Sequence, residues 1–402
     1  MRPATDRGEA PGEMEPLVLS GASRHRAALS DLALELAAAS AGLKRSLPAG
    51  ILAALADLVR AMNCYYSNLI EGHPTHPVDI ERAMKDDYST DAEKRNLQLE
   101  ARAHVTVQHW IDSGAIKGKA FSVDSVRQLH RRFSELLPEG LLTVSDPETG
   151  RATTVLPGEF RADDVRVGRH VAISPAAVPR FMARFEEVYG GLGKSETILA
   201  AAAAHHRLLW IHPFADGNGR VARLMSHASL LDVLDTGSVW SIARGLARNA
   251  TDYKQHLVNC DGKRRNDLDG RGNLSEEAVA EFTRFFLTTC LDQVRFMEQL
   301  IRPERLRQRI VRWAEEETRL GTLPVNSGLI LEAVLYRGNL PRGDVAAVLG
   351  QTDRNARRVV SALLEKGVLT SEGTRSALSI AFPAALAARW MPGLFPEHAE
   401  RD

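Results

Sequence analysis

The residues best suited to chemistry stand in one short run, and a further arginine follows one helical turn later: His212-Pro213-Phe214-Ala215-Asp216-Gly217-Asn218-Gly219-Arg220, then Arg223. Gly217 accepts positive φ at no steric cost, so neighbouring backbone N–H groups can turn toward one point. A glycine-rich turn before a helix, with Arg220 and Arg223 beside it, is typical of an anion site. Asp216 is suited to holding the Mg²⁺ of a polyphosphate, and His212 to moving a proton near neutral pH. These residue types favour transfer of a phosphate-containing group from a nucleotide.

Two helices are predicted to hold this run. Residues 197–211 (TILAAAAAHHRLLWI) are rich in Ala and Leu and lack Gly and Pro, which indicates a buried helix. Pro213 and the Gly-Asn-Gly triplet end it, and a second helix is predicted from Arg220 onward. The run is not a Walker P-loop, because the Gly-x4-Gly-Lys-Ser/Thr pattern is absent. His205 and His206 lack the spacing of a zinc hydrolase, so we expect them to pack beside the site.

The run resembles the Fic family signature, His-x-Phe-x-Asp/Glu-Gly-Asn-Gly-Arg-x-x-Arg, and matches it at every defined position. The resemblance implies a mainly α Fic fold with a small β-hairpin flap. It also implies a nucleotidyltransferase that uses ATP and Mg²⁺ to transfer AMP to a Ser, Thr or Tyr hydroxyl of a protein target or of itself. The Doc-like branch that phosphorylates instead usually has Lys in place of Gly219, which favours AMP transfer here.

The resemblance implies a role for each signature residue. His212 would be the general base that deprotonates the target hydroxyl, and Phe214 would anchor the loop on the core. Asp216 would bind the Mg²⁺ that bridges the α- and β-phosphates. Arg223 would meet the γ-phosphate. The anion hole would be formed by the backbone of three residues together with one arginine: Gly217, Asn218, Gly219 and Arg220.

A shorter motif, Ser67-x-x-x-Glu71-Gly72, ends a predicted helix at about residues 50–72. It is similar to the inhibitory-helix motif of many Fic proteins, in which the Glu pairs with the second arginine of the signature, here Arg223. A carboxylate there occupies the cation that a γ-phosphate needs and repels the phosphate charge. ATP would then bind with its α-phosphate misaligned for in-line attack. The alternative is an ordinary helix that ends in Glu-Gly, with Gly72 as its C-cap.

Residues 142–175 carry Gly, Pro and β-branched residues, which favours extended chain and turns. Within them, Phe160 and the segment with Arg166, Val167 and His170 resemble the Fic flap, a hairpin whose open edge would pair with a target segment through main-chain hydrogen bonds. The alternative is a surface hairpin without a function. Tyr253 stands where a tyrosine of the family often lines the nucleotide-base pocket, although a Tyr and a Leu four residues apart are more often core.

The C-terminal part resembles a winged helix-turn-helix domain, with three helical segments followed by two short β runs around a Gly-containing turn. Its recognition helix would run from Asp353 to Lys366, with Arg354, Arg357 and Arg358 near the start. Residues 301–402 carry 15 basic and 12 acidic side chains, a balance of +3. That balance is weak for a protein that binds duplex DNA. Dimerisation or docking of a target is the alternative use of such a domain.

Periodicity, together with what the resemblance implies, predicts five parts in the 402 residues. The first is a mobile N-terminal tail, because its Pro, Gly and charged residues show little periodicity. The predicted boundaries are the tail at 1–25, a helical region with the inhibitory helix at 26–115, the Fic catalytic core at 116–300, a connector helix at 301–325 and the winged helix-turn-helix domain at 326–396.

Composition restricts the cellular location and the classes of partner that we expect. Lys+Arg and Asp+Glu both number 51, so no global field points to nucleic acid or to a membrane. Cys64, Cys260 and Cys290 are far apart, which suits a reducing cytoplasm and neither a disulfide framework nor a zinc knuckle. Residues 1–16 lack the apolar region of a signal peptide, and no run of about 18 apolar residues is present. We expect a cytoplasmic protein with no membrane partner and, as is common in the family, a homodimer.

Two alternatives to a self-inhibited adenylyltransferase remain open. In the first, Glu71 orients a water molecule, so that the protein both adds and removes AMP, as some relatives with an inhibitory glutamate suggest. In the second, which belongs to another class, the chain is a DNA-binding transcriptional regulator whose Fic core only senses a nucleotide. The intact His212 argues against a pure sensor, because a sensor needs no general base.

Overall fold

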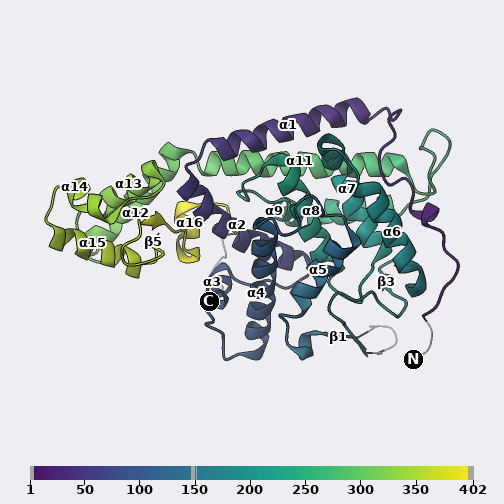
Figure 1. Cartoon of the computed structure of the whole chain (residues 1–402), viewed down its shortest axis with the longest axis horizontal. Helices are drawn as coiled ribbons and strands as arrows, with labels where there is room; N and C mark the ends of the chain where they lie inside the picture. The colour runs from purple at the N-terminus through teal and green to yellow at the C-terminus, as the bar shows by residue number, and fades with distance from the viewer. Residues whose placement is uncertain (1–3, 146–149, 151, 397–402) are drawn as a thin grey trace.

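The structure is a computed structural model that describes residues 4–145, 150 and 152–396. Over these residues the chain forms sixteen α-helices, and its strands are confined to three two-stranded hairpins. Figure 1 shows an elongated molecule, in which the helices of residues 303–365 lie at one end and the helices around the signature lie in the larger part toward the other. The expected mainly α fold is confirmed.

Eleven helices precede residue 301 and build the part of the molecule that carries the signature. They are α1 (Arg26–Arg45), α2 (Ala49–Ile70), α3 (Pro77–Ala83), α4 (Ala92–Asp112), α5 (Val123–Ser134), α6 (Val178–Tyr189), α7 (Lys194–Ile211), α8 (Asn218–Leu234), α9 (Ile242–Arg248), α10 (Ala250–Cys260) and α11 (Glu276–Leu300). The 3-10 turns among them are η1 (Pro11–Met14), η2 (Glu139–Leu141) and η3 (Pro175–Ala177).

The β-structure of this part is two hairpins. β1 (Thr143–Ser145) pairs with β2 (Ala152–Thr154), and β3 (Arg166–Val167) pairs with β4 (His170–Val171), both antiparallel. In the second hairpin, residue 166 lies opposite 171 and residue 167 opposite 170. Residues 142–175, for which extended chain, turns and one flap hairpin were predicted, therefore contain two small hairpins.

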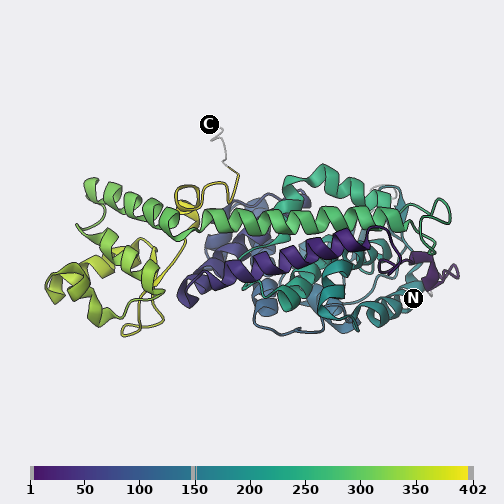
Figure 2. The ribbon, with the colours of Figure 1, turned by 90° about the horizontal axis from the view of Figure 1, so that it is seen from above.

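The helix pair α7 and α8 lies at the centre of the part of the molecule that precedes residue 301. Almost every residue of α7 is buried, as its run of alanines predicts, because small side chains allow neighbouring helices to approach on all sides. The long helices α1 and α11 lie side by side and cover this pair, as Figure 2 shows. Ser275 caps α11, its hydroxyl accepting a hydrogen bond from the Ala278 N–H at 3.1 Å.

The prediction of a mobile tail is wrong for residues 4–25, which are packed on the molecule. Met14 and Leu17 are buried, and the Leu17 carbonyl accepts a hydrogen bond from the Tyr189 hydroxyl at 2.6 Å. The guanidinium of the fully buried Arg207 donates to the Pro16 carbonyl at 2.9 Å. Local composition could not predict the ordered position of residues 4–25, because the partners that hold them are more than 150 residues away in the sequence.

The C-terminal part contains α12 (Pro303–Arg319), α13 (Ser327–Arg337), η4 (Arg342–Asp344), α14 (Val345–Leu349), α15 (Asp353–Glu365), β5 (Leu369–Thr370), β6 (Ser379–Ile380), η5 (Ala384–Leu386) and α16 (Ala387–Trp390). β5 and β6 are antiparallel, with residue 369 opposite 380. Three helices followed by a hairpin is the order that the sequence predicted, and its identity as a winged helix-turn-helix stays a prediction.

The hydrophobic core does not stop at the predicted boundary near residue 326. One buried cluster contains Leu58 and Met62 of α2, Leu300 at the end of α11, and Met391 and Leu394 near the C-terminus. The C-terminal part therefore shares a core with α2, in addition to its own packing around α13 and α15.

None of the described helices is by itself long and apolar enough to cross a membrane. By length and composition alone, α1 and α2 taken together meet that test, with a bend of 119° between them.

Candidate active site

The signature forms the connection between α7 and α8. α7 ends at Ile211, and His212 adopts a left-handed backbone with φ 52° and ψ 62°. Gly217 is also left-handed, with φ 79°, and α8 begins at Asn218. A histidine in this conformation is uncommon and strained, so the surrounding contacts must hold it there.

His212 is half-buried and has the protonation state of a base. Its Nδ1 lies 3.3 Å from the Leu209 carbonyl oxygen, which leaves Nε2 as the nitrogen able to accept a proton. Burial lowers the pKa of His212 to about 4, with a further lowering by the charge of Arg161. The imidazole is therefore neutral at physiological pH, as a general base requires.

Arg161 holds the backbone of His212 in place. Its Nε donates to the His212 carbonyl oxygen at 2.7 Å, its Nη2 to the Ile173 carbonyl at 2.5 Å, and its backbone N–H to the Pro213 carbonyl at 2.9 Å. Arg161 is 5% exposed and lies just before the flap hairpin. We did not predict this role, although Arg161 directly follows Phe160 in the segment that resembled the flap.

The interior of the loop is closed by Phe214 and Asn218. The Asn218 side chain accepts from the Phe214 N–H at 3.0 Å and donates to the Phe214 carbonyl at 2.9 Å. The fully buried Phe214 ring stacks on His130 of α5, with centroids 3.9 Å apart and planes within 3°. His130 in turn accepts a hydrogen bond from the Gly158 N–H at 2.8 Å. Phe214 is thus the anchor that the sequence predicted, and His130 is a contributor that it did not reveal.

The first turn of α8 has the geometry that suits an anion. Its leading N–H groups, at Asn218, Gly219 and Arg220, have no acceptor within the helix, because the first helical bond runs from Val221 N–H to the Gly217 carbonyl. Glu71 lies directly against this turn, since a Cβ added at Gly219 would collide with its Oε1. A carboxylate of the chain itself therefore lies beside the place where an anionic ligand would bind.

Arg223 contacts two residues of the short motif at the end of α2, Ser67 and Glu71. Its Nε donates to the Ser67 hydroxyl at 2.9 Å, and its Nη2 to the Ser67 carbonyl at 3.1 Å and to Glu71 Oε1 at 2.5 Å. Burial opposes ionisation of Glu71, but the charge and hydrogen bond of Arg223, with smaller contributions from Arg220 and His73, keep its pKa below the usual value. Gly72 follows with φ 86°, the left-handed position that ends α2.

Arg220 has partners that the sequence did not predict. Its Nη2 lies 3.0 Å from Nδ1 of His73 and 3.4 Å from Oε2 of Glu100, and that Glu100 oxygen is 2.8 Å from the same His73 nitrogen. The guanidinium also lies 5.2 Å from the centre of the Phe133 ring. His73 follows Gly72 directly and so could have been suspected, whereas Glu100 is one of several acidic residues on an amphipathic helix.

Asp216 fits a magnesium ion that a nucleotide carries with it. Its carboxylate is exposed at the edge of the loop, and none of the hydrogen bonds or ion pairs between described residues involves it. Within the described ranges, no group of three or more His, Cys, Asp and Glu side chains is arranged to hold a metal. Mg²⁺ commonly takes one or two protein carboxylates and completes its shell with phosphate oxygens and water, so a single aspartate here is chemically suitable.

The four residues predicted for the flap divide into two kinds. Val167 is 47% exposed at the tip of the β3–β4 hairpin, and Arg166 is exposed beside it. His170, by contrast, is anchored to α7, with Nε2 2.8 Å from the Trp210 carbonyl. Phe160 packs inward, 5.9 Å from the ring of Phe214. A groove of about 280 Å³ runs between β2, residues 159–163 and Ala215 of the loop.

Of the remaining predicted residues, Tyr253 is buried close enough to Arg223 and Glu71 for their charges to affect its pKa, whereas the arginines of α15 belong to the C-terminal part. The Tyr253 ring is buried, and its hydroxyl is 2.7 Å from Nε2 of His205, so in this structure it packs in the core. Burial raises its pKa to about 12. Arg354, Arg357 and Arg358 are exposed on α15, and no ion pair between described residues involves them.

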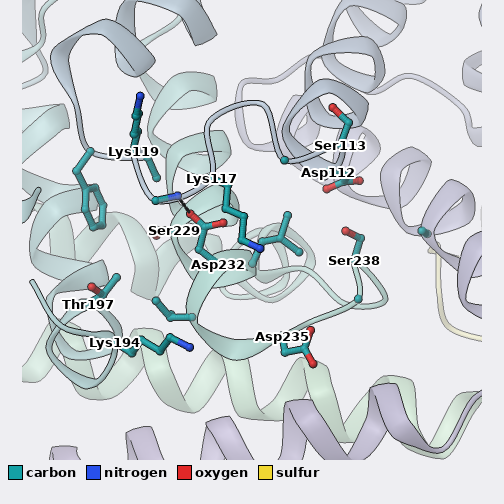
Figure 3. Close-up of a pocket in the computed structure, with 18 of the residues that line it drawn as sticks. Asp112, Ser113, Lys117, Lys119, Lys194, Thr197, Ser229, Asp232, Asp235 and Ser238 are labelled. Carbon is teal, nitrogen blue, oxygen red and sulfur yellow. Dashed lines mark hydrogen bonds between the residues drawn. The ribbon is translucent and has the colours of Figure 1, made fainter.

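The broad trough in Figure 3 is not part of this site. It has a volume of about 1470 Å³ and lies at the C-terminal end of α8, which is roughly 25 Å from the loop for a helix of this length. Its walls mix lysines such as Lys117 and Lys194 with aspartates such as Asp232, which accepts a hydrogen bond from the Gly118 N–H at 2.7 Å. This lining has no uniform charge.

A family model described as the Fic/DOC family matches residues 120–230. The protein adenylyltransferase Fic of Nematostella vectensis is 30% identical over 194 residues, which cover 46% of this chain and 41% of that protein. The protein adenylyltransferase Fic of Drosophila willistoni is 28% identical over 169 residues, which cover 42% of this chain and 31% of that protein. The chain thus spans less than half the length of these curated relatives.

Two solved structures are similar to this one. A Fic family protein from Desulfovibrio desulfuricans gives a TM-score of 0.50 at 17% identity, covering 87% of this chain and 96% of its own. Fic-1 from C. elegans gives a TM-score of 0.50 at 15% identity, covering 68% of this chain and 72% of its own. Likeness at such identities concerns the fold alone. The family match and the geometry of the loop together identify residues 120–230 as a Fic/DOC domain.

Proposed function

We propose that this protein is an adenylyltransferase that transfers AMP from ATP to a hydroxyl group of a protein and that inhibits itself through Glu71. The observation that carries the proposal is the position of a neutral His212, with Nε2 open, next to the anion site at the start of α8. The names of the curated relatives, both protein adenylyltransferases, support the same reaction.

In the proposed reaction, the target hydroxyl oxygen attacks the α-phosphorus of ATP. The new bond joins that oxygen to phosphorus, the bond to the oxygen bridging the α- and β-phosphates breaks, and pyrophosphate leaves. His212 Nε2 takes the hydroxyl proton. The N–H groups at the start of α8, together with Arg220, would bind phosphate oxygens and stabilise the charge that develops on them.

Magnesium would be held by Asp216 and by the phosphates that it accompanies. It would supply positive charge against the polyphosphate, which is its usual contribution in phosphoryl and nucleotidyl transfer. The chain's own part is to keep the Asp216 carboxylate exposed at the edge of the loop, close to the anion site.

Glu71 would inhibit transfer by acting as an internal anion. Its carboxylate contacts Arg223 and lies against Gly219, so a γ-phosphate that approached Arg223 would meet a like charge already in contact with that arginine. The nucleotide would then bind in another position, with its α-phosphate out of line with the hydroxyl. Movement of α2 would remove Glu71 and Ser67 together, because both belong to the same helix end.

The target segment would bind along the β3–β4 hairpin and the groove beside it. Val167 and Arg166 lie at the outward tip, and the groove of about 280 Å³ reaches Ala215, two residues from Pro213 in the loop. Main-chain pairing with a strand edge would place a hydroxyl near His212 while reading little of the target sequence.

The test is incorporation of label from α-labelled ATP with Mg²⁺, comparing wild type, Glu71→Gly and the double variant Glu71→Gly/His212→Ala. We expect weak labelling by wild type, strong labelling by the single variant and none by the double variant. Label from γ-labelled but not α-labelled ATP would instead indicate phosphorylation. If neither label is incorporated into any of a varied set of protein targets, the proposed activity is contradicted.

A DNA-binding regulator is the competing function, and the three exposed arginines of α15 are the observation in its favour. It predicts salt-dependent binding to duplex DNA that weakens when Arg354, Arg357 and Arg358 are replaced by Ala. The same triple variant should leave AMP transfer by the Glu71→Gly protein unchanged if the two functions are separate. Sequence-selective DNA binding without any AMP transfer would favour the regulator.

A further inference from the structure

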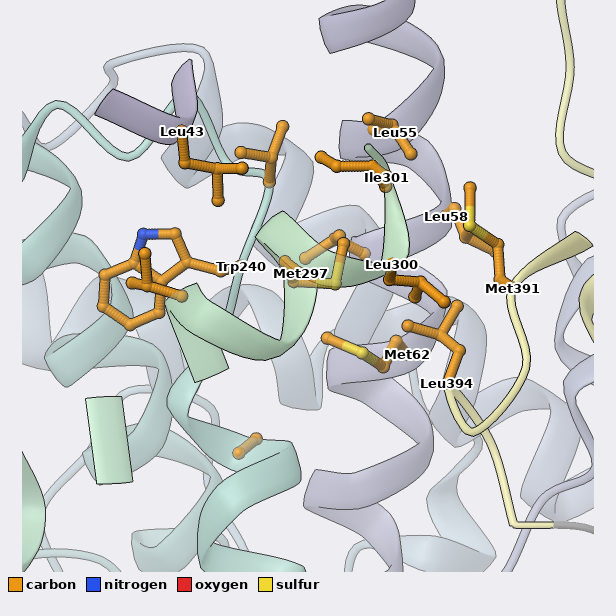
Figure 4. Packing of buried hydrophobic residues seen from close by; sticks show 14 of the residues in the cluster. Leu43, Leu55, Leu58, Met62, Trp240, Met297, Leu300, Ile301, Met391 and Leu394 are labelled. Carbon is orange, nitrogen blue, oxygen red and sulfur yellow. The ribbon is translucent and has the colours of Figure 1, made fainter. Parts of the chain in front are cut away.

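The C-terminal segment, residues 391–395, packs against the helix that carries Glu71. Figure 4 shows Leu58 and Met62 of α2 facing Met391 and Leu394 within one buried cluster. All four side chains are at most 5% exposed. Separating these surfaces would expose apolar area on both, at a cost of roughly 25 cal/mol for each Å².

Polar and aromatic contacts fix the position of this segment against α2. The Tyr66 hydroxyl donates to the Leu394 carbonyl at 2.9 Å in a buried setting. The Tyr65 ring meets the Phe395 ring edge to face, with centroids 5.6 Å apart and planes at 87°. Tyr66 directly precedes Ser67, whose hydroxyl and carbonyl both bind Arg223.

The opposite side of the segment is held by the catalytic part of the molecule. Arg244 of α9 donates through Nη2 to the Gly393 carbonyl at 2.8 Å. The same guanidinium lies 3.6 Å from the centre of the Phe296 ring of α11. The segment is thus wedged between α2 on one side and α9 and α11 on the other.

Two more contacts join the C-terminal part to the chain around α2. The Ala384 N–H donates to Oε2 of Glu81 at 2.7 Å, and Glu81 belongs to α3, which follows Glu71. At the start of α2, Gly50 lies so close to the Gly338 carbonyl that an added Cβ would collide with it. Contacts from the C-terminal part therefore lie before and after the Ser67–Glu71 motif.

We propose that the C-terminal part, residues 326–396, is a clamp that keeps Glu71 in the anion site, so that loosening residues 391–395 from α2 releases the inhibition. α2 is one uninterrupted helix from Ala49 to Ile70, so a shift at Tyr66 is transmitted to Ser67 and Glu71 within about one turn. This inference rests on the proposed inhibition by Glu71 and names the element that regulates it.

Three single substitutions in the full chain test the clamp, and one of them, Glu81→Ala, removes the carboxylate that accepts from the Ala384 N–H. Tyr66→Phe removes the hydroxyl that binds Leu394 and keeps the ring, and Phe395→Ala removes the aromatic contact with Tyr65. Tyr336→Phe is the matched control, because this hydroxyl is on the C-terminal part but on an 87% exposed residue of α13. Lys85→Ala is the control for Glu81→Ala, since it breaks the Lys85–Glu81 pair and leaves the Ala384 contact intact.

The first readout is hydrogen exchange of the amides of residues 60–73, which requires no catalysis. We expect Tyr66→Phe, Phe395→Ala and Glu81→Ala each to speed exchange there roughly two- to tenfold, the range that one lost hydrogen bond or packing contact allows, and the two controls to leave it unchanged. Faster exchange confined to residues 384–396, with α2 unchanged, would overturn the clamp.

The second readout is AMP transfer. The same three variants should raise transfer by wild type by a similar factor and add nothing in a Glu71→Gly background, where no inhibition is left to release. If Glu71→Gly is active but the variants loosen α2 without raising transfer, the clamp is refuted while the proposed activity stands. If Glu71→Gly is inactive, the proposed activity fails, and hydrogen exchange alone decides whether the C-terminal part holds α2.

Discussion

The anion site lies between the loop of residues 212–220 and the end of α2, and the polar groups of these two sides differ in how completely they are hydrogen-bonded. On the loop side, the polar groups of Phe214 and Asn218 satisfy one another, and Arg161 donates to several backbone carbonyls. On the α2 side, several buried polar atoms have no hydrogen-bond partner among the described residues. These are Asn68 Oδ1 on α2 and, on the neighbouring helix α4, Gln108 Nε2 and both ring nitrogens of His104. On the loop side, the described atoms without a partner are His130 Nε2 and Arg220 Nε.

From this difference we expect the α2 side to be the one that moves. A buried polar atom without a partner costs about 1–3 kcal/mol, so the closed position of α2 is less favourable than its many contacts suggest. The loop bears no such cost at the groups that fix His212. The structure therefore combines a loop whose backbone is held by Arg161 with a helix end that carries, among the described residues, an unpartnered polar atom, and the predictions below test each side.

The largest effect is expected from the loop. In a Glu71→Gly background, His212→Ala should reduce AMP transfer roughly 10²- to 10⁴-fold, the usual contribution of a general base. Initial rates with α-labelled ATP measure this, and His109→Ala, at an exposed histidine of α4, is the control. A loss of less than tenfold would place the base elsewhere.

The next effect comes from the α2 side. Glu71→Gly should raise transfer by wild type roughly 10- to 100-fold, because a hydrogen bond between charged groups contributes about 1.5–3 kcal/mol. Glu71→Gln keeps the shape without the charge and should give a smaller rise. Equal rates for wild type and both variants would show that the carboxylate does not inhibit. Glu93→Gln, at an exposed site on α4, controls for loss of an acidic residue.

The lowered pKa of His212 predicts an unusual pH profile. An ordinary histidine with a pKa near 6.5 would be neutral in roughly one tenth of molecules at pH 5.5, whereas a pKa of about 4 leaves nearly all of them neutral. kcat/KM of Glu71→Gly should therefore stay nearly constant from pH 7.5 to 5.5 and fall only as the pH approaches 4. A decline centred on pH 6.5 would contradict the burial of this imidazole.

The smallest effect is expected from removing the Ser67 hydroxyl, which is the uncharged partner of Arg223 in the inhibitory contact. Ser67→Ala removes the hydroxyl that accepts from Arg223 but keeps the carbonyl and Glu71, so transfer should rise only roughly two- to tenfold. Combined with Glu71→Gly, it should add little. A fall in transfer would mean instead that Ser67 helps to hold Arg223 in its active orientation.

Much of the helical framework and of the loop was predictable from local sequence. The alanine-rich run indicated α7, Pro213 and Gly217 marked the turn, and Gly72 marked the end of α2, because each of these signals acts over a few residues. The tail at residues 4–25 was the main error, since its order depends on distant partners such as Arg207 and Tyr189.

The sequence by itself determined which residues could serve as base, metal ligand and anion site, and in what order they stand. The tertiary structure alone decided how they are held. It placed Arg161 on the His212 carbonyl, His73 and Glu100 on Arg220, and residues 391–395 against α2. Such partners are separated by tens to hundreds of residues, and packing brings them together without any spacing that a sequence pattern could reveal.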